Sequence, residues 1–379
     1  MPSYFPPPGD GGERIGPARA GFDEERLAQA VAFAEAHESP WPRSMYVDEG
    51  RYIGGVDLQE EPPFDEVLGE VRPRGGPAGL ILRGGRIVAE WGDTARADMT
   101  FSIAKSYLAV LAGIAVARGL IRSVDDPVRG YALDQSFEAP QNRTITWRHL
   151  LQQTSEWEGT LWDKPDLADR NRHVGPGAAA RKKGTHRDLQ PPGAFWEYND
   201  VRVNLLSFAL MQVFRRPLPE VLREAVMDPI GASSTWEWRG YRNSRFEIDG
   251  RMMESVSGGA HWGGGLFIST RDHARFGYLV HRRGRWGERK IVPERWIAAL
   301  RTPCPIKPIY GFLWWLNTGR QIYPSAPESS IFCLGMGTNL IWLDDALDLV
   351  VIARWIARDH VDGLIGKIMG SLEASQRAP

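Results

Sequence analysis

The sequence predicts an α+β fold, in which one antiparallel sheet built from both ends of the chain is flanked by helices and carries an inserted helical lobe. Strand-like apolar runs occur early, at residues 79–82 and 86–91, and again late, at residues 339–343 and 347–353. The residues between these two groups show helix-like patterns and many turn formers. Elements with apolar faces must bury them against one another, so the economical arrangement joins both ends in one sheet.

This arrangement divides the chain of 379 residues into three parts. Residues 1–20 are rich in proline and glycine and are expected to form a flexible arm. Residues 21–125 together with 262–379 are assigned to the sheet domain, and residues 126–261 to a mainly helical inserted domain. The active site is expected between these two domains.

The elements of the sheet domain begin with a helix at residues 24–37, where apolar side chains recur at helical spacing. The glycines at 84–85 supply the positive φ of a hairpin turn between the two early strands. Residues 102–118 are apolar on nearly every side, which is typical of a buried helix, and a glycine at position 119 ends it.

The middle of the chain is expected to be helical and rich in loops. Residues 147–153 and 202–214 are helix candidates, whereas residues 171–193 have no apolar period and are expected to form a long exposed loop. Strands are expected to return only after residue 262. Two further helices are expected at residues 270–283 and 361–373.

Composition and charge exclude several classes of function. The formal net charge is −1, so the sequence lacks the basic excess of proteins that bind nucleic acid or anionic membranes. It also lacks the motifs of zinc sites, dinucleotide sites and phosphate loops, so neither a metal nor another cofactor is expected.

The protein is expected to be soluble and cytoplasmic. Its two cysteines, Cys304 and Cys333, are too few for a disulfide framework and are expected to be free thiols in a reducing compartment. No apolar signal segment is visible near the N-terminus. The longest apolar run, residues 107–117, is about half of the ~20 residues that span a bilayer.

The main chemical signal lies at the start of the predicted buried helix, where Ser102 and Lys105 are three residues apart. Side chains at that spacing share one face of a helix, so the lysine can reach the serine hydroxyl. Apolar walls and the positive end of the helix dipole disfavour the charged lysine, which allows it to accept the serine proton. The alternative is a helix-capping serine with a solvated lysine, but so apolar a helix leaves little solvent for that lysine.

Two other segments could complete such a site. Tyr198 precedes the predicted helix at 202–214 and could relay a proton, and either Tyr198 or Lys105 could be the formal base. The alternative for Tyr198 is a half-buried aromatic with a satisfied hydroxyl. Gly335 and Gly337 enter a predicted strand, where a backbone N–H could complete an oxyanion hole, and a bulge or tight turn is the equal alternative.

The order of these motifs resembles that of the penicillin-recognising serine hydrolases, which include class C β-lactamases, DD-peptidases, family VIII carboxylesterases and 6-aminohexanoate-dimer hydrolase. Stretches at residues 119–127, 145–155 and 263–276 are similar as well, and the likeness extends from about residue 79 to 356. The resemblance implies a β-lactamase/DD-peptidase-like fold and an acyl-enzyme mechanism.

Carried over by motif, the resemblance implies a role for each matching residue. Ser102 would be the acylated nucleophile, Lys105 its activator and Tyr198 the proton relay. The oxyanion hole would use the backbone N–H groups of Ser102 and Met336, beside Gly335 on the strand.

Two positions depart from the family pattern. Asp200 stands where the family usually has a neutral asparagine, which changes the hydrogen bonds available near the leaving group. Cys333 stands where the family commonly has a lysine or histidine that helps to hold a substrate carboxylate, and a cysteine cannot do so. This loss argues against penicillins and peptidoglycan stems as substrates. Cys333 could instead be a small buried hydrophobe.

Three aromatic residues remain as candidates. Trp157 could line an apolar acyl or amine pocket, and Tyr310 could hydrogen-bond the substrate, with core packing as the alternative for each. His261 could face the cleft, but a structural histidine is favoured because no aspartate or second histidine pairs with it at a recognisable spacing.

We therefore predict a serine hydrolase of the carboxylesterase or amidase type, whose partner is a small-molecule ester or amide and whose nucleophile is Ser102. The first alternative is a β-lactamase or DD-peptidase. The second is a catalytically silent binding protein that keeps the fold. The sequence indicates neither the natural substrate nor the oligomeric state.

Overall fold

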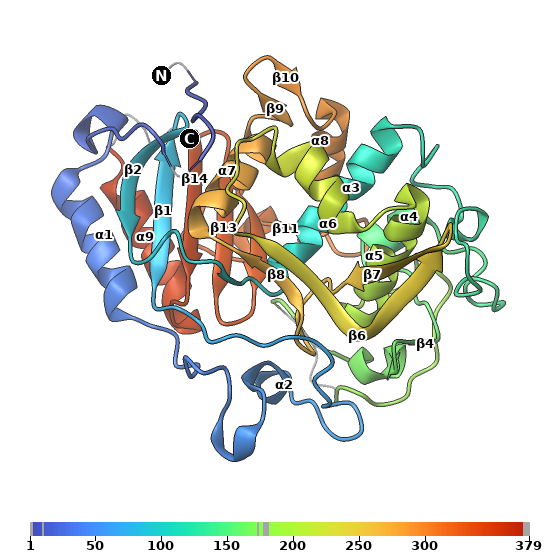
Figure 1. Ribbon diagram of the computed structural model, residues 1–379. Coiled ribbons are helices and arrows are strands. Elements are labelled where there is room, and N and C mark those ends of the chain that lie inside the picture. The colour runs from blue at the N-terminus through green and yellow to red at the C-terminus, as the bar shows by residue number, and fades with distance from the viewer. Residues whose placement is uncertain (1–2, 10, 173, 177–181, 374–379) are drawn as a thin grey trace.

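The computed structural model describes residues 3–9, 11–172, 174–176 and 182–373 of the chain. Its centre is a six-stranded sheet with the strand order β11-β12-β13-β14-β1-β2, in which all neighbours run antiparallel. Figure 1 shows the blue strands of the N-terminal part beside the red strands of the C-terminal part. The strands are β1 (Ala78–Arg83), β2 (Arg86–Trp91), β11 (Trp315–Leu316), β12 (Ile331–Gly335), β13 (Asn339–Asp344) and β14 (Leu349–Arg354).

Pairing between β1 and β14 joins distant parts of the chain. Ala78 lies opposite Arg354 and Arg83 opposite Leu349, with the residues between them in register. The hairpin from β1 to β2 turns at Gly84 and Gly85, whose φ angles of 60° and 83° are those that the Gly-Gly pair predicted.

Helices cover both faces of this sheet. α1 (Glu24–Ala36) and α9 (Val361–Ser371) pack against each other on one face, and α7 (Thr270–His281) lies against β1, β13 and β14 on the other (Figure 1). All residues of β1, β13 and β14 are buried, as expected for strands that are covered on two sides. These observations confirm the predicted α+β fold of an antiparallel sheet flanked by helices.

The helix α3 (Ile103–Ala117) packs against β12 and β13 and against α5 (Asp200–Phe214). Every side chain from Ile103 to Ala115 is buried, which confirms the buried helix that the apolar run predicted. A Cβ at Gly113 would lie 2.3 Å from an indole carbon of Trp296, so the close packing of α3 on Trp296 requires glycine.

The middle of the chain contains helices and also a long hairpin. Strands return first in a short pair at Thr160–Leu161 and Lys164–Pro165 and then in a long strand from Glu237, and not after residue 262 as the sequence predicted. The prediction was wrong because exposed arginines interrupt the buried residues of β6, so that no apolar run marks the strand in the sequence. In addition, the register with β7 shifts between Gly240 and Arg245. The elements are α4 (Trp147–Leu151), α5, α6 (Leu218–Leu222), a π-helical turn (Arg223–Met227), β6 (Glu237–Ile248), β7 (Arg251–Val256) and β8 (Gly265–Ile268).

A second sheet has the strand order β3-β8-β6-β7 and leads to the start of α3. The short strand β3 (Asp98–Met99) pairs with β8, and the N–H of the next residue, Thr100, donates to the carbonyl of Leu266. The remaining helices and strands are α2 (Ile53–Asp57), β4 (Thr160–Leu161), β5 (Lys164–Pro165), β9 (Arg285–Trp286), β10 (Arg289–Lys290) and α8 (Glu294–Leu300).

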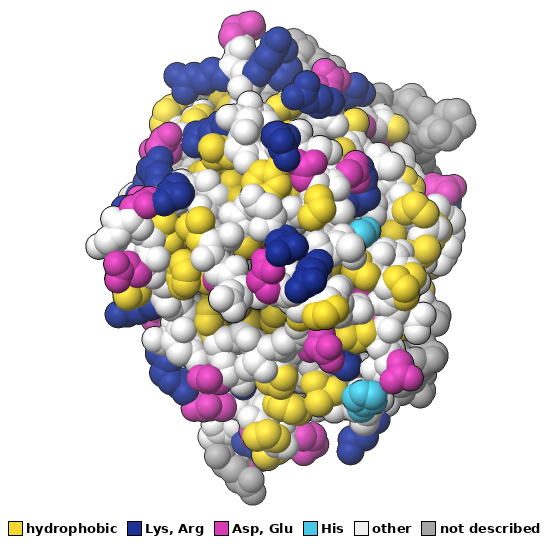
Figure 2. Space-filling view, turned by 90° about the vertical axis from the view of Figure 1, so that its right-hand side faces the viewer, with side chains coloured by type: hydrophobic (Ala, Val, Ile, Leu, Met, Phe, Trp, Pro, Cys, Tyr) yellow, Lys and Arg dark blue, Asp and Glu magenta, His cyan; other side chains and the backbone are white. Residues whose placement is uncertain are grey.

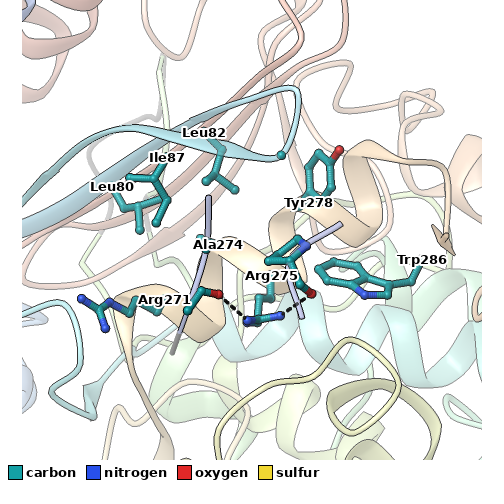
Figure 3. Close-up of a pocket in the computed structure, with 12 residues that line it drawn as sticks. Leu80, Leu82, Ile87, Arg271, Ala274, Arg275, Tyr278 and Trp286 are labelled. Carbon is teal, nitrogen blue, oxygen red and sulfur yellow. Dashed lines mark hydrogen bonds between the residues drawn. The ribbon is translucent and has the colours of Figure 1, made fainter. Parts of the chain in front are cut away.

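The described part of the N-terminal segment is held against the body of the protein. The N–H of Tyr4 donates to the carbonyl of Gly84, and the buried guanidinium of Arg275 donates to the carbonyls of Pro6 and Gly11 (Figure 3). Composition predicted a flexible arm at residues 1–20, and it did not predict that backbone carbonyls there would bind a buried arginine. Figure 3 shows the pocket that remains beside α7, with walls formed by Leu80, Leu82, Ile87, Tyr278 and Trp286.

Within the described ranges, none of the helices combines the length and the apolar character that a bilayer crossing requires. Figure 2 shows one face of the molecule, on which basic and acidic side chains are interspersed.

Candidate active site

Ser102 lies at the turn that joins β3 to α3. It occupies the N-cap position of α3, and the preceding residue, Phe101, has a φ of +51°. This left-handed conformation is costly for a bulky residue and persists only when the surroundings fix it. The Phe101 ring is fully buried, with the rings of Trp41 and Trp355 at 5.4 and 6.5 Å in edge-to-face arrangements. The buried aromatic contacts therefore set the position of the serine.

Lys105 lies one turn further along α3, and its Nζ is 2.7 Å from the Oγ of Ser102. The lysine side chain is 1% exposed, whereas Ser102 is 8% exposed. A proton can therefore pass between the two groups without an intervening water. The structure brings together the two residues that the sequence placed on one helical face.

Asp200 is the first residue of α5, and its carboxylate joins Lys105 to Arg172. Asp200 Oδ1 lies 2.6 Å from Lys105 Nζ, and Arg172 donates to Asp200 Oδ2 at 2.8 Å. Burial would raise the pKa of this carboxyl, but Arg172, Lys105 and His261 together hold it well below its usual range. Where the family pattern has a neutral amide, this chain therefore carries a fixed negative charge.

Tyr198 lies beside Lys105 and is 3% exposed. Lys105 Nζ is 4.9 Å and Arg172 Cζ is 5.0 Å from the centroid of its ring, so two cations contact the aromatic face. The ring also stacks on Trp315 at 5.8 Å. Tyr198 thus belongs to the same cluster as Ser102 and Lys105, and its role as proton relay stays a prediction.

The end of β12 approaches the turn before Ser102. A Cβ at Gly335 would lie 2.2 Å from the carbonyl oxygen of Thr100, so glycine is required for this approach. Met336 follows directly, and its carbonyl accepts a hydrogen bond of 2.8 Å from the side chain of Asn339. The N–H of Met336 therefore follows directly on the residue of β12 that approaches the serine turn, and its role in an oxyanion hole stays a prediction.

Cys333 and Tyr310 are both buried. Cys333 lies on β12, and burial raises the pKa of its thiol well above the ordinary range, so the side chain is neutral. The hydroxyl of Tyr310 accepts a hydrogen bond of 3.3 Å from Gln153, and its ring lies 5.0 Å from that of Trp315. Tyr198, Tyr310, Trp315 and the half-buried Trp196 form one aromatic cluster beside Lys105.

Trp157 is buried, and its indole N–H donates to the carbonyl of Ser136 at 2.7 Å. It packs closely on Gly159, where a Cβ would lie 2.5 Å from the indole. Its proposed part in a substrate pocket stays a prediction.

Sequence reasoning missed a set of buried charged residues on the far side of Asp200. This buried charge cluster consists of the buried residues Glu60, Asp169, Arg172 and His261 and of the half-buried Lys183. The partners of His261 could not be recognised from spacing, because Glu60 is 201 residues away. Arg172 and Lys183 were expected in an exposed loop at 171–193, but both turn inward and contact buried carboxylates. The signal available in the sequence was the scarcity of lysine, which makes each lysine, including Lys183 in this loop, a candidate for a specific role.

Glu60, Asp169 and His261 bring potential ligand atoms within 4.8 Å of one another, a grouping that could hold a cation. The ammonium of Lys183 lies among these atoms, 3.3 Å from Asp169 Oδ1 and 3.3 Å from His261 Nε2, and contacts Glu60. Lys183 therefore supplies the positive charge at this point.

A family model described as Beta-lactamase matches residues 72–354. The chain belongs to the β-lactamase family. This match confirms the family expected from the sequence. The family consists mostly of serine hydrolases.

Individual relatives and solved structures show how far the likeness extends. An uncharacterized protein of Alkalihalophilus pseudofirmus is 24% identical over 294 residues, which cover 69% of this chain and 77% of that protein. A β-lactamase structure from Mycobacterium bovis has 20% identity and a TM-score of 0.54 over 80% of this chain and 95% of its own. EstCE1, a hydrolase with promiscuous acyltransferase activity, has 15% identity and a TM-score of 0.58 over 92% and 98%. These matches confirm the β-lactamase/DD-peptidase-like fold.

Proposed function

We propose that this member of the β-lactamase family is a serine hydrolase that cleaves a small-molecule ester or amide through an acyl-enzyme on Ser102. The observation that carries the proposal is the 2.7 Å contact between Lys105 Nζ and Ser102 Oγ at the start of a buried helix. A serine hydroxyl beside a buried lysine has a base within reach and an N-terminal helix turn to stabilise an oxyanion.

The reaction begins when the Ser102 oxygen attacks the acyl carbon of the substrate and the hydroxyl proton passes to Lys105 or Tyr198. The N–H groups of Ser102 and Met336 hold the oxyanion of the tetrahedral intermediate. As this intermediate collapses, Lys105 or Tyr198 returns a proton to the leaving alcohol or amine. Water then attacks the acyl-enzyme, and the acid is released with Ser102 restored.

Cys333 favours a simple ester or amide over a β-lactam. A neutral, buried thiol cannot pair with the carboxylate that penicillins carry, whereas a cation at that position can. The aromatic cluster beside Lys105 adds apolar surface that suits an acyl or amine group without charge. A small-molecule partner and a cytoplasmic location remain part of this proposal.

The proposal is tested with p-nitrophenyl esters of increasing acyl length on the wild type and on Ser102→Ala. Hydrolysis that disappears in Ser102→Ala would support the nucleophile, and the best chain length would indicate the size of the pocket. Ser106→Ala is the matched control, because Ser106 lies on the same helix with its hydroxyl bonded to the carbonyl of Leu313 at 2.8 Å. Equal rates in wild type and Ser102→Ala would exclude Ser102 as the nucleophile.

Nitrocefin separates the leading proposal from a β-lactamase. Turnover of nitrocefin at a rate comparable to that of the best ester would favour the β-lactamase. A wild-type protein that neither hydrolyses these substrates nor reacts with a fluorophosphonate would indicate a binding protein.

A further inference from the structure

His261 connects the buried charge cluster to Asp200. Its Nε2 contacts the carboxylate of Glu60, and its Nδ1 lies 3.4 Å from Asp200 Oδ2 and 3.7 Å from Asp169 Oδ2. The imidazole is fully buried and stacks on Trp262 at 3.9 Å. Because both ring nitrogens face carboxylate oxygens, the doubly protonated imidazolium fits this position best.

The charges in this part of the protein balance when His261 is protonated. Three carboxylates are joined to three cations by the contacts described above, and Lys105 is not counted in this balance. The carboxylates are those of Glu60, Asp169 and Asp200, and the cations are Arg172, Lys183 and His261.

Neighbouring elements add two further titratable groups. Lys164 lies 5.2 Å from the ring of Trp262 and interacts with the charge of Glu60 as well as with those of Glu66 and Asp65. Tyr241 faces the two aspartates, but burial and their charge raise the pKa of its hydroxyl, so it stays neutral.

We propose that His261 is a positioning residue: its positive charge, paired with Glu60, offsets Asp200 and thereby sets the pH above which Lys105 or Tyr198 can take the proton of Ser102. This inference rests on the proposed function. Without the charge on His261, only Arg172 and Lys105 would offset the Asp200 carboxylate, so this carboxylate would favour more strongly the ammonium form of Lys105, which cannot accept a proton. If Tyr198 is the base, the excess negative charge opposes its phenolate and acts in the same direction.

The rate of Ser102 labelling by a fluorophosphonate across pH 5–10 tests this inference. In that reaction the serine oxygen bonds to phosphorus, fluoride leaves, and the hydroxyl proton passes to the base. The rising limb of the profile is the pH range in which the labelling rate increases with pH. We expect His261→Gln to move this limb by about one unit to higher pH, so that labelling at a pH on the limb is about tenfold slower. The double variant His261→Gln/Glu60→Gln removes one charge of each sign and is expected to return the limb to its wild-type position.

Two further variants separate charge from packing. His261→Lys keeps a positive charge and is expected to keep the wild-type limb. His281→Gln removes another buried histidine, which pairs with Asp345 and Asp348, and is expected to leave the limb unchanged. Ser102→Ala provides the unlabelled blank.

The inference is overturned if His261→Gln lowers the labelling rate without moving the limb, or if the double variant fails to restore it. It is also overturned if His261→Lys moves the limb to higher pH, an outcome that can be read even when His261→Gln does not fold. A wild-type protein without labelling at Ser102 would instead remove the proposed function, and this inference with it. Normal labelling of the wild type with an unmoved limb in His261→Gln would leave the proposed function intact.

Discussion

The side chains of Lys105 and Asp200 meet beside Ser102, with Asp200 Oδ1 only 2.6 Å from Lys105 Nζ. Both side chains are almost completely buried, at 1% and 2% exposure, so solvent screens their interaction weakly. An ionised partner this close stabilises the ammonium form of a lysine. The negative charge of Asp200 therefore lies in direct contact with the residue proposed as a base.

Asp200→Asn is expected to move the rising limb of the labelling profile to lower pH by about one to three units, because the variant removes the negative charge that lies 2.6 Å from Lys105 Nζ. The measurement is the rate of Ser102 phosphonylation as a function of pH. Asp249→Asn is a suitable control, because Asp249 forms an exposed ion pair with Arg215 on the surface. A limb that moves to higher pH would contradict the electrostatic role assigned to Asp200.

Gly335→Ala is expected to reduce activity strongly and to destabilise the protein by about 1–3 kcal/mol, because its Cβ would meet the carbonyl oxygen of Thr100 at 2.2 Å. The collision would push β12 away from the turn that carries Ser102. Ester hydrolysis and thermal unfolding measure the two effects. Gly370→Ala in α9 is the matched control, since a Cβ there meets nothing within 4 Å. Full activity in Gly335→Ala would show that β12 does not shape the site.

The stability of the protein is expected to fall as the pH rises from 6.5 to above 9, in part because of His261. Burial and Lys183 disfavour the charged imidazole, but Glu60 and Asp169 outweigh them and raise the pKa of His261 to about 9. A pKa that is higher in the folded state than the ordinary 6.5 contributes stability that is complete below pH 6.5 and is lost through pH 9. The contribution is on the order of 3 kcal/mol. Urea unfolding at pH 6 and pH 9.5 should show a smaller difference in His261→Gln than in the wild type, and equal differences would contradict the assignment.

Native protein is expected to resist thiol reagents at both cysteines. Cys304 and Cys333 are free and buried, and burial raises the pKa of each thiol, so little reactive thiolate is accessible. Titration with a chromogenic disulfide at pH 8 should find two thiols after unfolding in guanidinium and far fewer before it. Rapid modification of the native protein, accompanied by loss of hydrolysis, would place Cys333 in contact with solvent.

Local patterns were sufficient for the parts of the fold whose contacts are close in sequence. The apolar run from residue 103 predicted α3, the Gly-Gly pair predicted the first hairpin, and the spacing of Ser102 and Lys105 predicted their contact. Each of these features depends on residues within a few positions of one another, which is the range over which periodicity and turn chemistry act.

Contacts between distant segments were not predictable from a single sequence. Glu60 meets His261 across 201 residues, and nothing at either position indicates the other. Arg172 and Lys183 were expected to be solvated because charged residues in loops usually are, but here buried carboxylates provide their partners. The hairpin of β6 and β7 was missed because tertiary pairing, and not a clear alternation, determines it.

The turn that presents Ser102 is supported by a residue that precedes the span matched by the family model. The family model begins at residue 72, whereas Trp41, which packs against Phe101, and Glu60, which contacts His261, both precede it. A fragment trimmed to residue 72 would retain Ser102, Lys105 and Asp200 but lose the Trp41 contact that supports the serine turn and the carboxylate that pairs with His261. The span of the family match is thus shorter than the span on which the proposed site depends.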